Sequence, residues 1–126
     1  MRQETLNWLR QAKADLKAAK ANLDNGIFYV AAFLSQQCAE KSLKAFLLEK
    51  TREIPQTHNL IALGRSAGMP KKDWNWLVEL NADYSVARYP DAANGVPAEA
   101  YSKESAERKI NAAEEIFAWV NKWIGK

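Results

Sequence analysis

The sequence predicts an all-α protein, folded as an up-and-down bundle of about five helices: three long, one medium and one short. Apolar residues recur at helical spacing over long segments, and no segment alternates apolar and polar residues as a strand does. Proline or glycine stands between the apolar segments. The chain has 126 residues, the length of one domain, so we expect residues 1–126 to form a single bundle.

Residues 3–25 are expected to form the first helix. Its apolar residues recur at steps of three and four, which places them on one stripe: Leu9, Ala12, Leu16, Ala19 and Leu23. Asn25 and Gly26 tolerate the left-handed conformation that ends a helix. Because the turn is short, the first two helices should form an antiparallel hairpin.

The second helix, expected over residues 28–50, is the element around which the others should pack. Apolar residues occur on nearly every side of it: Phe28, Val30, Phe33, Leu34, Cys38, Leu43, Phe46, Leu47 and Leu48. A helix that is apolar all round lies inside a bundle. We therefore expect Cys38 to be a small buried residue rather than a nucleophile.

Four polar residues nevertheless lie in the middle of this helix: Gln37, Glu40, Lys41 and Lys44. At about 100° per residue they fall on one stripe. Polar groups on a central helix are costly unless partners satisfy them. The stripe is therefore a buried hydrogen-bond network, the floor of a cleft or part of a subunit contact. In the simplest interpretation Glu40 and Lys44 form an ion pair, and Lys41 extends along the surface with its charge in water.

Caps and breaks predict the remaining elements. Residues 51–56 should form a loop, and Thr57 should cap a short helix over residues 58–68. A medium helix should begin near Pro70 and end close to Tyr89, followed by an irregular stretch over residues 90–101. Ser102 should cap the last helix, which carries the most regular apolar repeat of the chain: Ala106, Ile110, Ala113, Phe117, Val120 and Ile124.

The composition argues against several classes of protein. The formal net charge is only +3 and the charges are interleaved along the helices, so we expect no dedicated nucleic-acid-binding patch, although a local phosphate site fits. One cysteine allows no internal disulfide and supplies no metal-binding set. We expect no metal and no cofactor. Without a secretion signal or a membrane-spanning run, a soluble cytoplasmic protein is expected.

The residues form no standard catalytic set, and we expect no catalytic residue. There is no glycine-rich loop with phosphate-binding spacing, no Ser–His–Asp combination and no cluster of histidine and cysteine. The single histidine, His58, is expected to cap or pack the short helix. The alternative is that its ring contacts a phosphate or a base.

The segment LNADYSVARYPD, at the end of the medium helix, holds a second group of polar and aromatic residues: Asp83, Tyr84, Arg88, Tyr89 and Asp91. Arg88 could make a two-pronged contact to a phosphate or carboxylate, and Tyr89 could stack on a base. Alternatively, Arg88 ties the following loop to the bundle through Asp91 or Glu40.

Four blocks of the sequence together resemble one known family. They are FLSQQCAEKSLKAFL, THNLIAL, LNADYSVARYPD and AYSKESAERKINAAEEI. In order and approximate spacing they resemble HEPN domains, the "higher eukaryotes and prokaryotes nucleotide-binding" family, over nearly the whole chain. The resemblance implies a helical bundle that is often dimeric. It also implies a partner, because family members are frequently encoded beside a minimal nucleotidyltransferase and act with it, sometimes as a toxin–antitoxin pair.

One branch of the family cleaves RNA, with an arginine followed after four to six residues by a histidine on a late helix. Arg88 is the corresponding arginine, but no histidine follows it anywhere in the chain. Arg52 and His58 have the required spacing, yet they bracket a loop rather than sharing a helix. Ribonuclease activity by the family mechanism is therefore not expected.

The leading hypothesis is a non-catalytic HEPN-type module, homodimeric, that binds a nucleotide or a nucleotidyltransferase partner in a cleft between the second and the medium helix. Phosphate would meet Lys41, Lys44 and Arg88. Gln37 and Tyr89 would orient or stack a base, His58 would line the rim, and Glu40 and Asp91 would complete the site. One alternative is a metal-independent ribonuclease that uses His58 with Arg52 or Arg88. Another is a structural adaptor whose polar stripe pairs two subunits.

Overall fold

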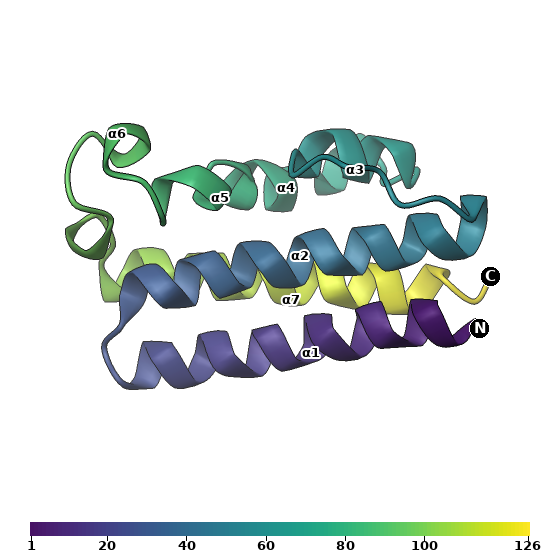
Figure 1. The fold of residues 1–126 in the computed structure, drawn as a ribbon, viewed down its shortest axis with the longest axis horizontal. Coiled ribbons are helices and arrows are strands. Elements are labelled where there is room, and N and C mark those ends of the chain that lie inside the picture. The colour runs from purple at the N-terminus through teal and green to yellow at the C-terminus, as the bar shows by residue number, and fades with distance from the viewer.

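Helices form all the regular structure of the protein. The computed structural model describes all 126 residues and contains no strand, so the predicted all-α bundle is confirmed. Three long helices lie lengthwise beside one another (Figure 1): α1 (Gln3–Asp24), α2 (Phe28–Thr51) and α7 (Lys103–Trp123).

Shorter helices form a second layer on the other side of α2 (Figure 1). In chain order they are α3 (Leu60–Ser66), the 3₁₀ turn η1 (Lys71–Asp73), α4 (Trp74–Asn81), α5 (Asp83–Val86), α6 (Pro90–Ala93) and the 3₁₀ turn η2 (Pro97–Glu99). This layer therefore spans the chain between the end of α2 and the start of α7.

α1 and α2 form the predicted antiparallel hairpin. Gly26, in the turn between them, has a φ of +74°, which glycine adopts readily because it has no Cβ. The apolar stripe of α1 packs into the core through four buried residues, Leu9, Ala12, Leu16 and Ala19, while Leu23 is half-buried at its end.

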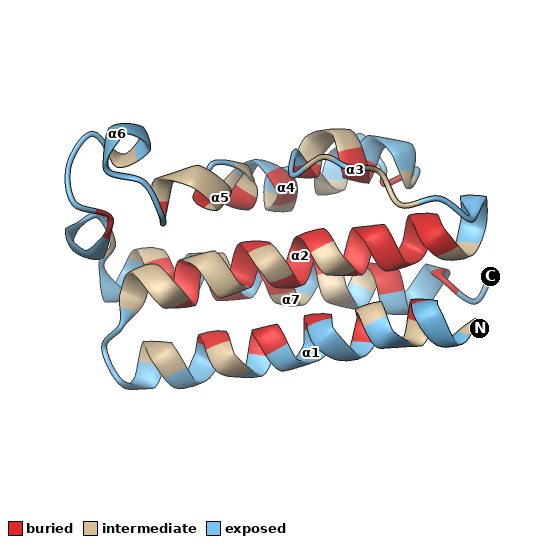
Figure 2. Ribbon diagram, viewed as in Figure 1, coloured by how far each residue is buried: buried red, intermediate tan, exposed pale blue.

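α2 is buried along most of its length (Figure 2). Fourteen of its 24 residues are buried, because it contacts α1 and α7 on one side and α3, α4 and α5 on the other. Cys38 is 0% exposed. Burial raises the pKa of its thiol to about 12, so the thiol stays protonated and serves as a small packed residue.

α7 begins where Ser102 was predicted to cap it. The Ser102 hydroxyl accepts a hydrogen bond from the backbone N–H of Ser105 at 3.1 Å, and the Ser105 hydroxyl accepts one from the N–H of Ser102 at 2.9 Å. Such reciprocal capping satisfies two otherwise unpaired donors at the helix start. The predicted apolar repeat then lies against the core; only Phe117 is half-buried rather than buried.

The predicted medium helix is wrong in its length. The chain turns at Ala82 between α4 and α5, and α5 ends at Val86 rather than near Tyr89. Tyr89 is extended, with φ −119° and ψ 128°, because the ring of Pro90 excludes helical backbone at the preceding residue. The stretch expected to be irregular contains α6 and η2, each with proline in its first turn, a position that suits proline.

The predicted cap of the short helix was also wrong. α3 begins at Leu60, and the side chain of Asn59, not Thr57, accepts from its first turn, with Ala62 N–H at 3.0 Å. Further along, Gly64 faces α4 so closely that a Cβ there would lie 2.4 Å from Cδ1 of Leu77. Leu77 is fully buried, so only glycine allows this packing of α3 on α4.

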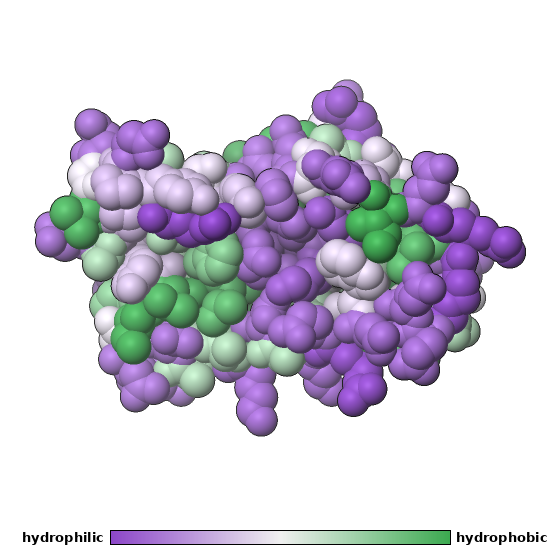
Figure 3. All heavy atoms as spheres, viewed as in Figure 1, coloured by the Kyte–Doolittle hydropathy of each residue, from purple (hydrophilic) through white to green (hydrophobic).

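The surface is mainly polar. On the face shown in Figure 3, hydrophilic atoms cover the middle, and hydrophobic atoms gather toward the two ends of the molecule. The large apolar residues that remain exposed are Met1, Ile27, Val78, Tyr89, Val96 and Trp123. No helix is both long enough and apolar enough to span a bilayer.

Candidate functional site

The polar stripe of α2 forms a buried hydrogen-bond network around Glu40, which is 6% exposed. Its carboxylate accepts from the Gln36 amide at 3.0 Å and from the Lys44 ammonium at 3.0 Å. Residues four apart on a helix share a face, so α2 itself places both donors. The third donor is Nδ1 of His58, 3.1 Å from Oε1 and 3.0 Å from Oε2.

These three donors determine the ionisation of Glu40. Burial alone would raise the pKa of the carboxyl group, because it removes water from the charged form. The hydrogen bonds from Gln36, His58 and Lys44, together with the charge of Lys44, outweigh burial and hold the pKa of Glu40 below its usual value. Glu40 is therefore a buried anion at neutral pH and a fixed acceptor for the histidine.

His58 stands in the loop before α3, between this buried network and the solvent. Its ring stacks on Tyr84 of α5, with centroids 3.8 Å apart and 11° between the planes. Because Nδ1 faces Glu40, that nitrogen carries the proton and donates it. Nε2 makes no hydrogen bond within the chain, and the side chain is 48% exposed. The imidazole is thus held at one nitrogen and open at the other.

Arg88 follows α5 and lies near the same tyrosine. Its guanidinium carbon is 4.8 Å from the ring centroid of Tyr84, 4.9 Å from that of Tyr89 and 5.4 Å from that of Phe33. Arg88 is exposed and forms no ion pair, so the predicted tie to Asp91 or Glu40 is wrong. Aromatic faces attract a guanidinium without neutralising it, which leaves its N–H groups available.

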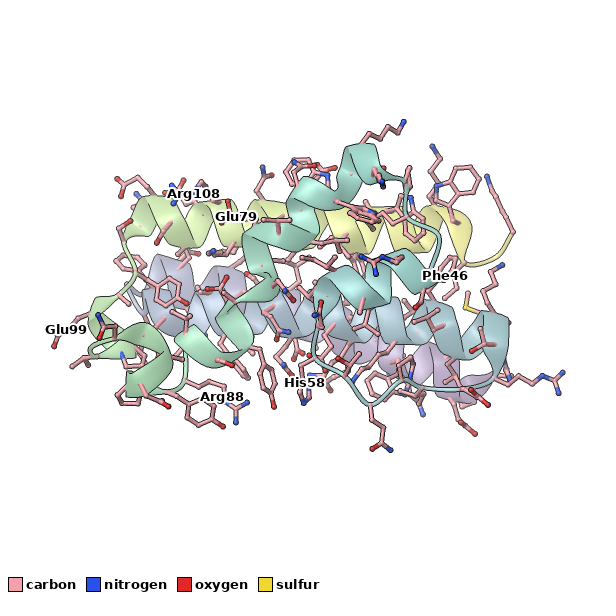
Figure 4. All side chains as sticks on the ribbon, turned by 90° about the horizontal axis from the view of Figure 1, so that it is seen from above. Phe46, His58, Glu79, Arg88, Glu99 and Arg108 are labelled. Atoms are coloured by element: carbon pink, nitrogen blue, oxygen red, sulfur yellow. The ribbon has the colours of Figure 1, made fainter.

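A shallow apolar groove of about 380 Å³ borders Arg88. Phe33 and Val30 of α2 line one side, and Val96 and Pro97 near η2 line the other. In the view of Figure 4, Arg88 and His58 both lie along the edge formed by α5 and the loop before α3. We call the surface formed by His58, Tyr84, Arg88 and Tyr89 the Arg88 surface.

The other predicted site residues have partners inside the chain. Lys44 is buried and paired with Glu40. Lys41 pairs with Asp15 of α1, so the prediction that its charge extends into water was wrong. Gln37 donates to the side-chain oxygen of Gln36 at 2.8 Å. Asp91, by contrast, is exposed, on α6.

The structure therefore brings together only part of the predicted set. Glu40, Lys44 and His58 form one network, and His58, Arg88 and Tyr89 share one surface around Tyr84. Because Lys44 is buried against Glu40 and Lys41 is paired with Asp15, the predicted cleft with all three cations facing a phosphate is not present. Of the stripe's possible roles, the structure shows the buried network.

Sequence reasoning missed two members of these networks. Gln36 is fully buried and stands four residues before Glu40, a spacing that could have identified it as a donor. Asp15 lies on the apolar side of α1 and is 6% exposed; an acidic residue in an otherwise apolar stripe was the available signal. Neither contacts the Arg88 surface directly.

A second buried carboxylate, Asp83, connects α5 to α7. The hydroxyl of Tyr101 donates to Oδ1, and the ammonium of Lys109 lies 2.9 Å from Oδ2. Lys109 also pairs with Glu79 at 2.8 Å. Burial raises the pKa of Asp83 above its usual value despite these partners. Asp83 at its centre is buried, and the charged groups around it are paired inside the chain, which suits a role in joining helices.

No group of three or more histidine, cysteine, aspartate or glutamate side chains is placed to hold a metal ion. The arrangement of the site therefore depends on hydrogen bonds, ring stacking and one exposed guanidinium. Such groups can hold a phosphate or carboxylate and a flat ring, and an imidazole with one nitrogen held by a carboxylate can accept or donate a proton.

Comparisons with known proteins give consistent results. A protein-family model described as HEPN domain matches residues 5–123. A search of curated proteins gives no significant match.

Solved structures share the whole fold. TT1696 from Thermus thermophilus has a TM-score of 0.89 at 28% identity, covering 96% of this chain and 98% of that one. ST0689, described as an archaeal HEPN homologue, has a TM-score of 0.83 at 34% identity, covering 98% and 99%. A HEPN domain protein from Thermotoga maritima, tm0613, has a TM-score of 0.75 at 26% identity, covering 95% and 98%. With the family model matching nearly its whole length, the chain belongs to the HEPN domain family.

Proposed function

We propose that this HEPN domain is a non-catalytic, homodimeric module that binds a nucleotide at the Arg88 surface and acts with a minimal nucleotidyltransferase. The observation that carries the proposal is the state of Arg88. It is an exposed guanidinium with no carboxylate partner, close to three aromatic rings. Unpaired arginines of this kind are suited to bidentate contacts with phosphate.

Groups next to Arg88 could supply the other contacts that a nucleotide requires, a stacking face and a hydrogen bond. Tyr89 is 44% exposed and offers a ring face for a base. The free Nε2 of His58 can hydrogen-bond a phosphate or a base edge. Glu40 and Lys44 hold His58 in place rather than touching the ligand. Lys41, Gln37 and Asp91 take no direct part in this version of the site.

Isothermal titration calorimetry with ATP and GTP tests the proposal. The wild-type protein should bind at least one of them, and Arg88→Ala should weaken binding by about tenfold or more, because a bidentate charged contact is lost. Tyr89→Leu should weaken it by less. The matched control is Arg65→Ala, since Arg65 is also exposed and lies 5.4 Å from an aromatic centroid, that of Trp74, away from the Arg88 surface.

Two results would contradict the nucleotide site. One is the absence of heat from folded wild-type protein at millimolar nucleotide. The other is equal weakening by Arg65→Ala and Arg88→Ala, which would indicate general attraction of anions by positive charge. Circular dichroism of every variant checks that the fold is unchanged.

The partner and the biological setting belong to the same proposal and rest on family membership. A cytoplasmic nucleotidyltransferase partner, with the two forming a toxin–antitoxin pair, is the arrangement we propose. Co-expression with the nucleotidyltransferase of a neighbouring gene should give a complex that survives gel filtration. A nucleotidyltransferase that elutes separately at micromolar concentration would remove this part and leave the nucleotide site untouched.

The homodimer is tested by light scattering. Glu40 and Lys44 pair with each other inside one chain, which argues against the adaptor alternative, in which the polar stripe pairs two subunits. Wild-type protein should have the mass of a dimer, and Lys41→Ala and Gln37→Ala should leave that mass unchanged. A monomeric mass for either variant would restore the adaptor alternative.

One observation favours a second function, that of a metal-independent ribonuclease. His58 is oriented by a buried carboxylate and keeps Nε2 free, while Arg88 lies on the same tyrosine ring. A carboxylate-held imidazole is a suitable general base, and an arginine can stabilise a phosphorane-like charge. No hydrogen bond or ring contact joins Arg52 to His58, so Arg52 would not take part.

A cleavage assay separates the two functions. Labelled single-stranded RNA is incubated with purified protein in EDTA. Cleavage that disappears in His58→Ala and Arg88→Ala, but persists in Arg52→Ala, would establish the enzyme. Intact RNA with wild-type protein leaves the binding module as the function.

A further inference from the structure

A second site lies at the end of the bundle where α2 and α7 finish. It is an open pocket of about 660 Å³. Residues from three separate segments line it: the last turns of α2, the stretch from α3 into η1, and the last turns of α7 with the residues that follow. In Figure 4, Phe46, on the floor of this pocket, lies toward one end of the molecule and Arg88 lies toward the other.

The pocket is strongly basic. Its four lysines are exposed, and none of them forms an ion pair: Lys50, Lys72, Lys122 and Lys126. Asp73 is its only acidic residue. Elsewhere in the chain the lysines that line helix contacts are paired with carboxylates, as Lys41, Lys44 and Lys109 are. The unpaired charge here favours an anionic ligand.

The floor and one wall of the pocket are aromatic. Phe46 and Trp119 are in contact, with ring centroids 5.2 Å apart, and form the floor. Trp123, one turn further along α7, is 41% exposed. Lys122 and Lys126 each lie 5.2 Å from the Trp123 ring centroid. An exposed tryptophan flanked by lysines offers a stacking face with positive charge on its margins.

We propose that this pocket, the Trp123 pocket, binds single-stranded nucleic acid. Grooves that bind single strands combine aromatic faces, on which bases stack, with cations that follow the phosphates. The lysines here come from three separate segments, the end of α2, η1 and the end of α7, so they suit successive phosphates of a strand rather than one compact group. Neither an arginine fork nor a glycine-rich backbone cradle is present among the lining residues to hold a single phosphate tightly.

The modest net charge of +3 gave no indication of such a patch. The four lysines are dispersed between positions 50 and 126, and acidic residues lie close to several of them in the sequence. Folding gathers these lysines around a pocket that contains one acidic residue, Asp73. The Trp123 pocket is therefore a product of the tertiary structure and shares no residue with the Arg88 surface.

Fluorescence anisotropy with a labelled twelve-nucleotide oligouridylate, in EDTA and low salt, tests the proposal on the full-length protein. The wild type should bind, and the double variant Lys50→Glu/Lys122→Glu should bind about tenfold or more weakly. The matched control, Lys13→Glu/Lys17→Glu, makes the same change in net charge on the exposed face of α1. We expect it to weaken binding by about twofold at most.

Stacking is tested separately from charge. Trp123→Ala should weaken binding by about tenfold, since stacking contributes about 1–3 kcal/mol per base, and Trp123→Phe should restore most of it. Trp123 is at the surface, so neither substitution empties the core. Circular dichroism and thermal melting confirm that each variant is folded. Equal binding by Trp123→Ala and wild type would overturn the stacking arrangement.

Three further results would overturn the proposal. If the wild-type protein binds no oligonucleotide, the proposed site does not exist. If both double variants weaken binding equally, binding depends on the overall charge of the protein and not on this pocket. ATP that displaces the oligonucleotide at an equal concentration would show a pocket for one nucleotide rather than for a strand. Arg88→Ala should bind the oligonucleotide as wild type does. A loss in that variant would place the strand on the Arg88 surface, so failure here is distinguishable from failure of the proposed nucleotide site.

Discussion

Two buried carboxylates, Glu40 and Asp83, are each paired with a lysine, yet they behave differently. The pKa of Glu40 lies below its usual value, and that of Asp83 lies above it. Burial opposes ionisation in both. Glu40 has the whole charge of Lys44 and two further donors, Gln36 and His58. Asp83 shares Lys109 with Glu79 and has one further donor, the hydroxyl of Tyr101.

The comparison shows how one type of interaction serves two purposes. The Asp83 cluster joins α4, α5 and α7 around a buried carboxylate, and its partly exposed member, Glu79, is already paired with Lys109 and Arg108, so we expect the cluster to stabilise the fold. The Glu40 cluster ends in a half-exposed imidazole and therefore connects the interior to a surface. Buried ion pairs are weak evidence of stability by themselves. The exposed, unpaired nitrogen of His58 is the feature that the Asp83 cluster lacks.

The largest effect should come from removing the shared lysine. Lys109→Met leaves Asp83, which is only 3% exposed, without a cation, while Glu79 keeps its pairing with Arg108. We expect a loss of about 3 kcal/mol in the free energy of unfolding, the usual cost of an uncompensated buried charge. Lys44→Met should cost less, about 1–2 kcal/mol, because Gln36 and His58 still donate to Glu40.

Urea unfolding at pH 7 measures both losses. Lys103→Met, at the exposed start of α7, is the control and should change stability by less than about 0.5 kcal/mol. If Lys44→Met were as costly as Lys109→Met, the additional donors around Glu40 would not be compensating, and the contrast between the clusters would fail.

The two carboxylates should also give opposite dependences on pH. The depressed pKa of Glu40 contributes stability above its usual 4.5 that is lost as pH falls through the folded-state value. The advantage of wild type over Glu40→Gln should therefore shrink in acid. Asp83 has a raised pKa, so wild type should gain relative to Asp83→Asn as pH falls toward the usual 3.8. Unfolding measured from pH 6 to pH 3 should give slopes of opposite sign; slopes of the same sign would contradict the assignment.

A smaller effect is expected where the open network reaches the surface. Tyr84→Leu removes the ring on which His58 stacks and should lower stability by about 1 kcal/mol. Because the imidazole of His58 loses this stacking contact, its ¹⁵N chemical shifts should move toward those of a histidine in an unstructured peptide. Tyr101→Phe, in the Asp83 cluster, is the comparison and should leave the histidine shifts unchanged. A shift in that variant would show that the two clusters are coupled.

Substitution of Arg88 should change stability least and nucleotide binding most. Arg88 is exposed and unpaired, so Arg88→Gln should alter the free energy of unfolding by less than about 0.5 kcal/mol while reducing nucleotide binding. Thermal melting alongside calorimetry measures both quantities. A destabilisation of about 2 kcal/mol would indicate that Arg88 stabilises the turn between α5 and α6 through its aromatic contacts and is not free to bind a ligand.

The long helices could be predicted because their apolar repeats extend over many turns, so that errors at single residues do not matter. Short elements depend on single contacts. Thr57 and Asn59 both carry a side-chain oxygen that can cap a helix, and Asn59 caps α3. The N–H of Leu60, the first residue of α3, donates to the side chain of Asn81, a contact with a distant segment. No proline or glycine stands at the turn at Ala82, so the sequence contains no local signal for it. Such choices are made by tertiary packing, which local sequence does not contain.

The same limit applied to the candidate site. Glu40 and Lys44 were identified as a pair because their spacing of four residues is local. The pairing of Lys41 with Asp15 and the approach of His58 and Arg88 to one tyrosine depend on segments distant in the chain. The resemblance to HEPN domains, confirmed by the family model, did not show which charges are neutralised inside the bundle.

The missing side chain at Gly64 has a consequence for the imidazole several residues before it. At Gly64, α3 packs closely on Leu77, and the loop that leads into α3 carries His58, which contacts Glu40 and Tyr84. We expect Gly64→Ala to force α3 or Leu77 to move, and a movement of α3 would displace the loop that holds the imidazole. The absence of a Cβ at Gly64 is thus expected to affect the alignment of His58, six residues earlier in the chain.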